Sequence, residues 1–249
     1  MRPDLRESAN THRFFWISAL SAACVAALLG AAVLLGWYTR NEALIQINPA
    51  FVPMQYNTAL GFLLSGLGLA ALVFGLKKGP VLAGVLLIVI GGITLAEYLF
   101  GADLSLDQLF MEHYIEVETS SPGRMAPNTA LCFLLTGLTL TIGAQLKSRP
   151  GAGAPVGILG AIIISLGTVA FFGYFAQLET AYGWGSLTRM AIHTALGFIV
   201  IGLGFLASAW IMEKQRHSNL PWSTPVVIGI LGLTFTLTLW QAVFAHQNK

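Results

Sequence analysis

The fold is decided by the stretch RMAPNTALCFLLTGLTL, which covers residues 124–140. Its core, TALCFLLTGLTL, begins at Thr129, and two close copies begin elsewhere: TALGFLLSGLGL at Thr58 and TALGFIVIGLGF at Thr194. A methionine stands four residues before each threonine, and a polar residue stands directly before it. A long segment that recurs within one chain indicates an internal structural repeat.

The apolar character of these copies extends over most of the chain. Among the 249 residues, 55% are hydrophobic and 10% are charged, and the mean hydropathy is +0.73. Soluble domains carry roughly 25% charged residues. The composition therefore indicates an integral membrane protein in contact with the lipid bilayer, and nothing in it suggests nucleic-acid binding.

Seven stretches are apolar over about 20 residues, which is the length that crosses a bilayer as a helix. None of them shows the strong alternation of a transmembrane strand. We therefore predict an all-α integral membrane protein with seven transmembrane helices. The expected spans are 14–38, 54–76, 81–100, 129–146, 155–175, 190–212 and 225–245.

The features around each copy define a unit of two helices joined by an outer loop. Aromatic residues end the first helix of each unit at Trp37, Tyr98 and Tyr174, and the TAL motif opens the second helix. We predict one membrane domain over 1–249, built from three parallel helix-loop-helix repeats and one additional helix. The repeats cover approximately 14–76, 80–146 and 155–212, and the final helix covers 225–245. Three such hairpins can pack around a pseudo-threefold axis.

The distribution of basic residues predicts the orientation in the membrane. If the N-terminus is cytoplasmic, nine of the thirteen basic residues lie on the inner side together with three acids. Because positive charge accumulates on the cytoplasmic side, we expect the N-terminus inside and the C-terminus outside. The inner basic residues are Arg2, Arg6, Arg13, Lys77, Lys78, Lys147, Arg149, Lys214 and Arg216.

Asn57, Asn128 and His193 precede the three TAL motifs at the outer ends of their helices. One interpretation is structural: polar side chains here satisfy backbone N–H groups at a helix start, each contributing about 1 kcal/mol. The other is that the three groups line one outward-facing pocket, toward which three positive helix ends point. His193 departs from the asparagine of the other copies, which favours a specific ligand-facing role.

Further candidates for a ligand site are Glu97, Arg124 and Arg189. Glu97 lies in an apolar helix near its outer end, and both arginines lie in outer loops just before a TAL motif. Glu97 either reaches water at the interface or pairs with Arg124, Arg189 or His193 in a pocket. The longest outer loop, 101–124, places Leu106, Leu109, Phe110 and His113 at helical spacing, which predicts a short interfacial helix.

Several classes of chemistry have no support in the sequence. Glu112, His113 and Glu116 show no recognised metal-ligand spacing, so we expect no metal. The last span holds no lysine for a retinal Schiff base, and only His193 lies within a span, so we expect no cofactor. The sequence contains no phosphate-binding loop and no HExxH motif, and we expect no enzymatic activity in this chain.

The region DQLFMEHYIEVETSSPGRMAPNTALCFLL resembles the multi-pass N-terminal membrane region of bacterial sensor histidine kinases and GGDEF diguanylate cyclases. In many members of that family a CHASE-type sensor domain follows the last of these helices. The resemblance covers nearly the whole chain and implies location in the bacterial inner membrane. It also implies a catalytic output domain or partner protein outside this chain, because no kinase or cyclase region occurs in it.

The combined expectation is a sensory input module that detects a small molecule or a membrane state at its outer half. The ligand-binding candidates are Asn57, Asn128, His193, Glu97, Arg124 and Arg189. The expected partners are a small-molecule ligand, a downstream signalling domain or protein, and further copies of the chain. The alternatives are a small-solute transporter or channel, which requires a continuous polar path, and a structural module that only anchors or assembles.

Overall fold

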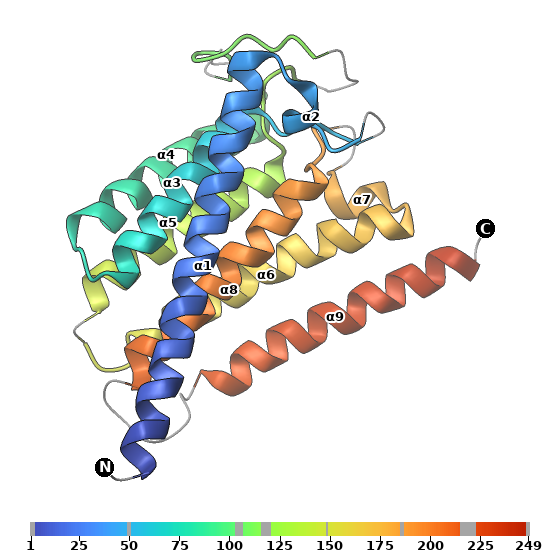
Figure 1. Cartoon of the computed structure of the whole chain (residues 1–249). Coiled ribbons are helices and arrows are strands. Elements are labelled where there is room, and N and C mark those ends of the chain that lie inside the picture. The colour runs from blue at the N-terminus through green and yellow to red at the C-terminus, as the bar shows by residue number, and fades with distance from the viewer. Residues whose placement is uncertain are drawn as a thin grey trace.

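Figure 1 shows a computed structural model of the chain, which describes residues 3–48, 51–102, 107–115, 121–147, 149–184, 187–214 and 223–247. The described residues form helices and loops and contain no strand. The long helices are α1 (Pro3–Thr39), α3 (Tyr56–Val73), α4 (Lys78–Phe100), α5 (Pro127–Leu146), α6 (Gly153–Ala176), α8 (Ile192–Lys214) and α9 (Thr224–Gln247). Two short helices, α2 (Glu42–Ile45) and α7 (Glu179–Tyr182), lie in loops at one end of the bundle. We call this the outer end, because the charge distribution predicts that it faces outward, and the opposite end the inner end.

Six helices in the described part of the chain are long and apolar enough to cross a membrane. They confirm the prediction of an all-helical protein with membrane-protein character. They are Asn10–Thr39 within α1, the whole of α3, α4, α5 and α6, and Ile192–Glu213 within α8. In α9 the apolar part, Thr224–Trp240, is shorter, so the seventh span stays a prediction.

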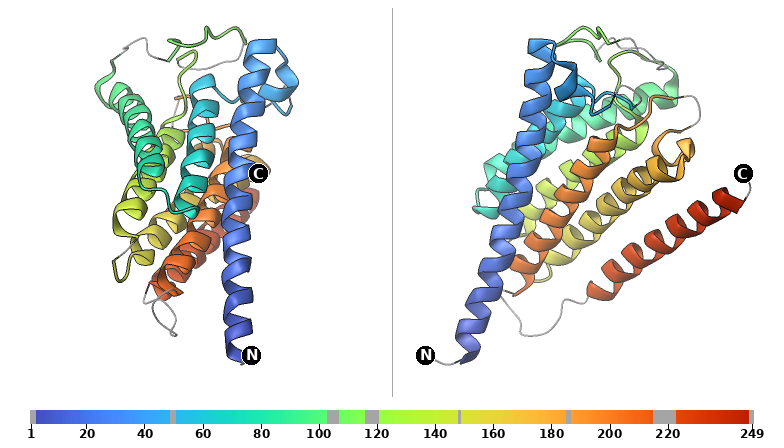
Figure 2. Two further views of the ribbon diagram at one scale, coloured as in Figure 1. Left: turned by 60° about the vertical axis from the view of Figure 1, so that its left-hand side comes forward. Right: turned by 45° about the vertical axis from the view of Figure 1, so that its right-hand side comes forward.

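The six helices form a closed ring. The most extensive contacts join α1 to α3, α4 to α5 and α6 to α8. Contacts of α3 with α4, α5 with α6 and α8 with α1 connect these pairs, and α3, α5 and α8 also touch one another inside the ring. The helix α9 lies outside the ring, runs alongside α6 and ends on the side of the outer loops, whereas α1 begins at the opposite end (Figures 1 and 2).

Three phenylalanines meet in the middle of the bundle. Phe62, Phe133 and Phe198 are the fifth residues of the three TAL copies, and each is fully buried. Their ring centroids lie 4.9–5.3 Å apart, the range of favourable aromatic contacts. A Cβ added at Gly61 or Gly197 would lie 2.5 Å from a neighbouring ring of this set. The centre of the ring is therefore filled by side chains at this depth.

Glycines bring the two helices of each pair into backbone contact. A Cβ at Gly30, Gly91 or Gly167 would lie 2.5, 2.5 or 2.8 Å from the carbonyl oxygen of the TAL alanine on the partner helix. Lipid offers no hydrophobic driving force between helices, so close packing of small residues supplies much of the attraction. The same close approach recurs further along the partner helices, at Gly66, Gly137 and Gly202.

Adjacent glycines on α4 offer a test of this packing. Gly91→Ala places a methyl group against the carbonyl oxygen of Ala130, whereas nothing lies within 4 Å of a Cβ at Gly92. We expect Gly91→Ala to lower the free energy of unfolding in bilayers by about 1–3 kcal/mol through overpacking. Gly92→Ala should leave it unchanged or raise it by up to about 1 kcal/mol, because alanine favours the helix. Equal effects of the two variants would contradict the backbone contact.

The outer ends of the pairs are tied by aromatic side chains. The indole N–H of Trp37 and the hydroxyls of Tyr98 and Tyr174 each donate a hydrogen bond to the carbonyl oxygen of the methionine preceding a TAL motif, at 3.0, 3.0 and 2.6 Å. Each aromatic residue stands three positions before a residue with positive φ that ends the helix. Those residues are Arg40, Gly101 and Gln177. The sequence repeat thus coincides with recurring hydrogen bonds, which place the outer loops above each pair.

Candidate functional site

A buried charged cluster lies at the outer end of α4. Glu97 is in the last turn of α4, Arg124 precedes α5, and Asp107 belongs to the loop between them. Arg124 donates from Nε to Asp107 at 2.6 Å and from an Nη to Glu97 at 3.3 Å. The three side chains are between 1% and 8% exposed, so the cluster is almost wholly removed from water. The predicted pairing of Glu97 with Arg124 is present.

Arg124 holds the cluster together. Its guanidinium also lies 5.4 Å from the centre of the Tyr98 ring, within the range of a cation–π contact. Burial alone lowers the pKa of Arg124, but the hydrogen bond and charge of Asp107 and the charge of Glu97 outweigh it, so the pKa is raised. A planar group with five donors can serve two carboxylates at once, which a lysine cannot do in the same geometry.

A cavity of about 230 Å³ adjoins this cluster between the outer halves of α3 and α4. Its polar lining combines an amide, a hydroxyl and both carboxylates of the cluster, and the rest of its wall is apolar or aromatic. Convergent polar groups in an apolar cavity are typical of small-molecule sites. The polar lining residues are Asn57, Thr94, Glu97 and Asp107; Leu60, Ile90 and Ile93 contribute to the apolar wall.

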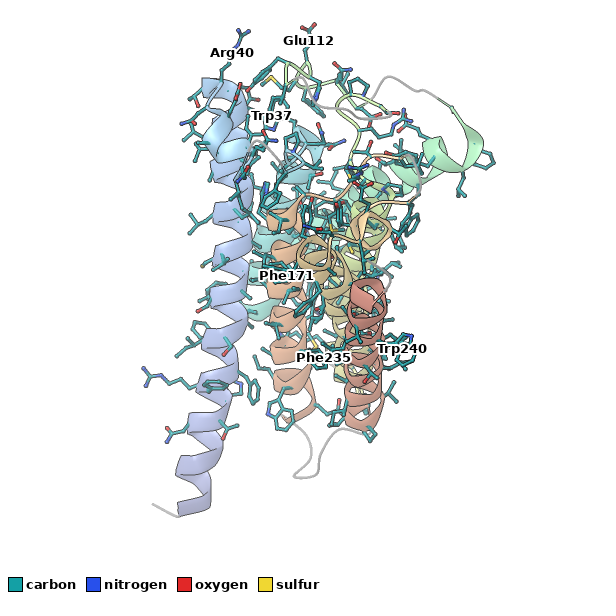
Figure 3. The ribbon with its side chains drawn as sticks, turned by 90° about the vertical axis from the view of Figure 1, so that its right-hand side faces the viewer. Trp37, Arg40, Glu112, Phe171, Phe235 and Trp240 are labelled. Carbon is teal, nitrogen blue, oxygen red and sulfur yellow. The ribbon has the colours of Figure 1, made fainter. Side chains whose placement is uncertain are left out.

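The loop segment 107–115 covers the cavity and crosses to the first helix pair. Phe110 lines the cavity and stacks on Tyr56 with 6.4 Å between ring centroids. The Tyr114 hydroxyl donates to the carbonyl oxygen of Trp37 at 3.1 Å, and the two rings meet edge to face. Figure 3 shows Arg40 and Glu112 at this outer end, with Trp37 closer to the bundle.

The prediction of a short interfacial helix in this loop is wrong for its described part. Leu109 and Phe110 lie in a bend, His113 lies in irregular backbone, and Leu106 falls outside the described residues. Contacts across the loop explain the difference. Aromatic contacts with α1 and α3 and the bond from the His113 backbone N–H to the Gln108 side chain at 3.1 Å hold the segment in an irregular path.

The packing of His113 predicts a pH-dependent loop. Its ring lies 5.7 Å from the Trp37 ring, and burial lowers its pKa below 6.5. As the pH falls below 6.5, an exposed histidine takes up the proton before the packed one does, so the packed state loses stability through the window down to the lower pKa. Hydrogen exchange of the 107–115 amides, corrected for intrinsic rates, should be faster at pH 5.5 than at 7.5. His113→Gln should abolish this difference, and His12→Gln should retain it.

The six predicted ligand residues do not lie together at one site. Asn57 lines the cavity, Glu97 lines it as well, and Arg124 contacts Glu97. Arg189 is 43% exposed and pairs with Glu179 at 2.8 Å on the surface. An exposed pair of this kind contributes about 0–1 kcal/mol. The structure therefore does not bring Arg189 to the cluster.

Asn128 and His193 are buried but do not share a pocket with Asn57. The Asn128 side chain donates to the carbonyl oxygen of Tyr182 at 3.2 Å and accepts from the N–H of Thr129 at 3.0 Å. The latter bond agrees with the structural interpretation of a helix-start device. His193 is 7% exposed and lies against the backbone of Ile45 in α2. The described residues therefore do not form a single pocket lined by Asn57, Asn128 and His193.

The sequence did not single out Asp107, Thr94 or Tyr56 for the site. Asp107 is one of several acids in an irregular loop, and no spacing rule links it to Arg124. Thr94 stands three residues before Glu97 and therefore on the same helix face. This three-residue spacing in the sequence could have predicted a polar face at the outer end of α4.

A larger cavity of about 470 Å³ lies on the inner side between α1, α6, α8 and α9. The described residues that line it are almost wholly apolar, and none of them carries a charged side chain. Phe14, Trp210 and Val227 are among the residues that border it. Such a space suits lipid acyl chains rather than a polar ligand, so the smaller outer cavity is the better candidate.

No described group of three or more His, Cys, Asp or Glu side chains is placed to hold a metal ion. The outer cavity can receive hydrogen-bond donors or positive charge through its carboxylates. In comparisons with protein-family models, curated proteins and solved structures, nothing matches this chain.

Proposed function

We propose that this chain is the sensory input module of a bacterial signal-transduction receptor in the inner membrane. In this proposal three parallel repeats and α9 supply seven spans, with the N-terminus cytoplasmic and the C-terminus outside. The module detects a small molecule at its outer half. Catalytic output belongs to a domain or partner protein outside this chain, and the receptor works as a homo-oligomer.

The observation that carries the proposal is the buried Glu97–Arg124–Asp107 cluster next to the outer cavity. Removing such charges from water costs several kcal/mol per ion, so a purely anchoring module gains no stability over apolar packing. Ionisable groups inside membrane proteins are therefore a sign of function. The resemblance of the sequence to sensor kinase and cyclase membrane regions supports the same proposal.

The central phenylalanines argue against the transporter alternative. Phe62, Phe133 and Phe198 fill the middle of the bundle with contacting rings. A channel needs a polar path across the bilayer, and a sensor does not. We expect liposomes that contain the protein to show no solute flux above that of empty liposomes.

The cluster is the switching element in this proposal. A ligand that binds Glu97 or Asp107 competes with Arg124 for the same oxygens. Because Asp107 belongs to the loop and Glu97 to α4, a change in their pairing alters how the loop 107–115 and α4 sit against α3. The ligand must prefer one arrangement by a few kcal/mol to shift the population usefully.

The test of the proposal is to measure the mass and the binding partners of the native gene product in its own membranes. An antibody against the 101–124 loop should detect either a band far above 26.6 kDa or a chain of that mass that co-purifies with a kinase or cyclase. A chain of 26.6 kDa with no signalling protein bound, or measurable solute flux in liposomes, would overturn the proposal.

A further inference from the structure

We infer that the cavity between α3 and α4 binds an organic ammonium ion, with its nitrogen against Glu97 and Asp107 and its apolar part against the helices. The inference names the ligand class of the site in the proposed function and rests on that function for its role in signalling. Binding itself depends only on the cavity.

The first step is the charge of the site. Two carboxylates and one guanidinium make up the cluster, and both carboxylates line the cavity whereas Arg124 does not. The cavity wall is therefore acidic. The negative end of the α4 dipole at the outer side adds to this, and the positive end of α3 beside Asn57 partly offsets it. Charge complementarity favours a cation over an anion.

The second step is the chemistry of the remaining wall. A hydrated divalent cation prefers six or more oxygen ligands, but this cavity offers few oxygens and is otherwise lined by aliphatic side chains such as Leu60, Ile90 and Ile93. Tyr56 and Phe110 add two aromatic rings, whose faces attract organic ammonium groups. The wall thus suits an amphiphilic cation rather than a metal ion.

The third step is size. A cavity of roughly 150 Å³ lined by apolar side chains accommodates benzene. The space here is about 230 Å³, which leaves room for a ring or short alkyl group together with an aminoalkyl group. A soluble amine and the ammonium headgroup of a phosphatidylethanolamine lipid both carry this chemistry.

The test is calorimetric titration of the chain in phosphatidylglycerol nanodiscs with phenethylammonium and with its neutral analogue 2-phenylethanol. We expect the neutral analogue to bind at least ten times more weakly. Glu97→Gln, which keeps the shape of the side chain, should raise the Kd of phenethylammonium at least tenfold. The matched variant Glu179→Gln, in the exposed pair with Arg189, should leave that Kd unchanged.

A second variant addresses the cavity without touching the charges. Leu60→Phe places a larger side chain in the apolar wall and should weaken both ligands, while the fold stays intact by circular dichroism. Equal affinity for phenethylammonium and 2-phenylethanol, or binding of the ammonium that neither Glu97→Gln nor Leu60→Phe weakens, would overturn the inference.

Two further measurements separate the source of the ammonium and the role of the site. The ratio of the phenethylammonium Kd of Glu97→Gln to that of the unaltered chain, taken within one lipid, cancels the attraction of an anionic bilayer surface for the cation. A smaller ratio in phosphatidylethanolamine than in phosphatidylglycerol nanodiscs identifies the lipid headgroup as the occupant, whereas equal ratios identify a soluble amine. Spin labels at the exposed Lys78 and Arg149, in a Cys24→Ala background, report on the inner helix ends. Binding that depends on Glu97 without a change in label distance supports the site and contradicts the sensory function.

Discussion

Phe133→Ala is expected to lower the free energy of unfolding by about 3 kcal/mol, toward the low end of the 3–5 kcal/mol typical of buried phenylalanines. Phe133 is fully buried and contacts both other central phenylalanines, at centroid distances of 5.3 and 4.9 Å. In lipid the transfer term largely vanishes, because acyl chains are as apolar as the interior. The loss arises from the cavity and the missing dispersion contacts.

The measurement is reversible unfolding of the protein in bilayers or mild detergent. Phe235→Ala is the matched control, because Phe235 lies on α9 with 52% of its surface exposed (Figure 3). We expect this control to change the unfolding free energy by less than about 0.5 kcal/mol. A similar loss for both variants would show that the central contact does not hold the three helix pairs together.

Arg124→Ala is expected to destabilise the protein by about 3–5 kcal/mol, because it leaves two carboxylates buried without the cation that they share. Arg124 bonds to Asp107 at 2.6 Å and to Glu97 at 3.3 Å, and all three side chains are at most 8% exposed. Arg124→Lys should recover only part of the loss. A lysine retains the positive charge but lacks the planar fork that reaches both acids.

Arg189→Ala provides the control for this prediction. Arg189 also pairs with a glutamate in an outer loop, but the partners are 43% and 62% exposed. Its removal should cost about 0–1 kcal/mol. The two variants are compared by thermal unfolding at one pH and salt concentration. If Arg124→Ala is as mild as Arg189→Ala, water reaches the cluster and the outer cavity is not a desolvated site.

The helical membrane character of the protein followed from the sequence through local rules. Each span is long enough and apolar enough to satisfy its own backbone hydrogen bonds, so its existence requires no knowledge of its neighbours. The recurring TAL motif likewise marked three equivalent positions, and the structure places the phenylalanine of each copy in one contact. The irregular path of 107–115 could not be predicted from the sequence, because it depends on aromatic contacts with α1 and α3.

The candidate site was only partly predictable for the same reason. Glu97 and Arg124 stood out because charge is rare within or beside apolar spans. Arg189 shares the sequence position of Arg124 before a TAL motif, yet it pairs with Glu179 at the surface. The two loops differ in length and in the acids they carry. The longer loop buries its acid, Asp107, against its arginine, whereas the pair in the shorter loop stays exposed.

The sequence by itself determined that the long apolar segments are helices, where the TAL motif recurs and which residues carry charge, because these depend on composition and short-range spacing. The tertiary structure alone decided that Phe62, Phe133 and Phe198 fill the centre of the bundle. It also decided that Asn57 lines the outer cavity whereas Asn128 and His193 do not, and that Asp107 and Glu97 line the same cavity. These relations join residues far apart in the chain. They depend on how the helix pairs pack, and no local pattern encodes those distances.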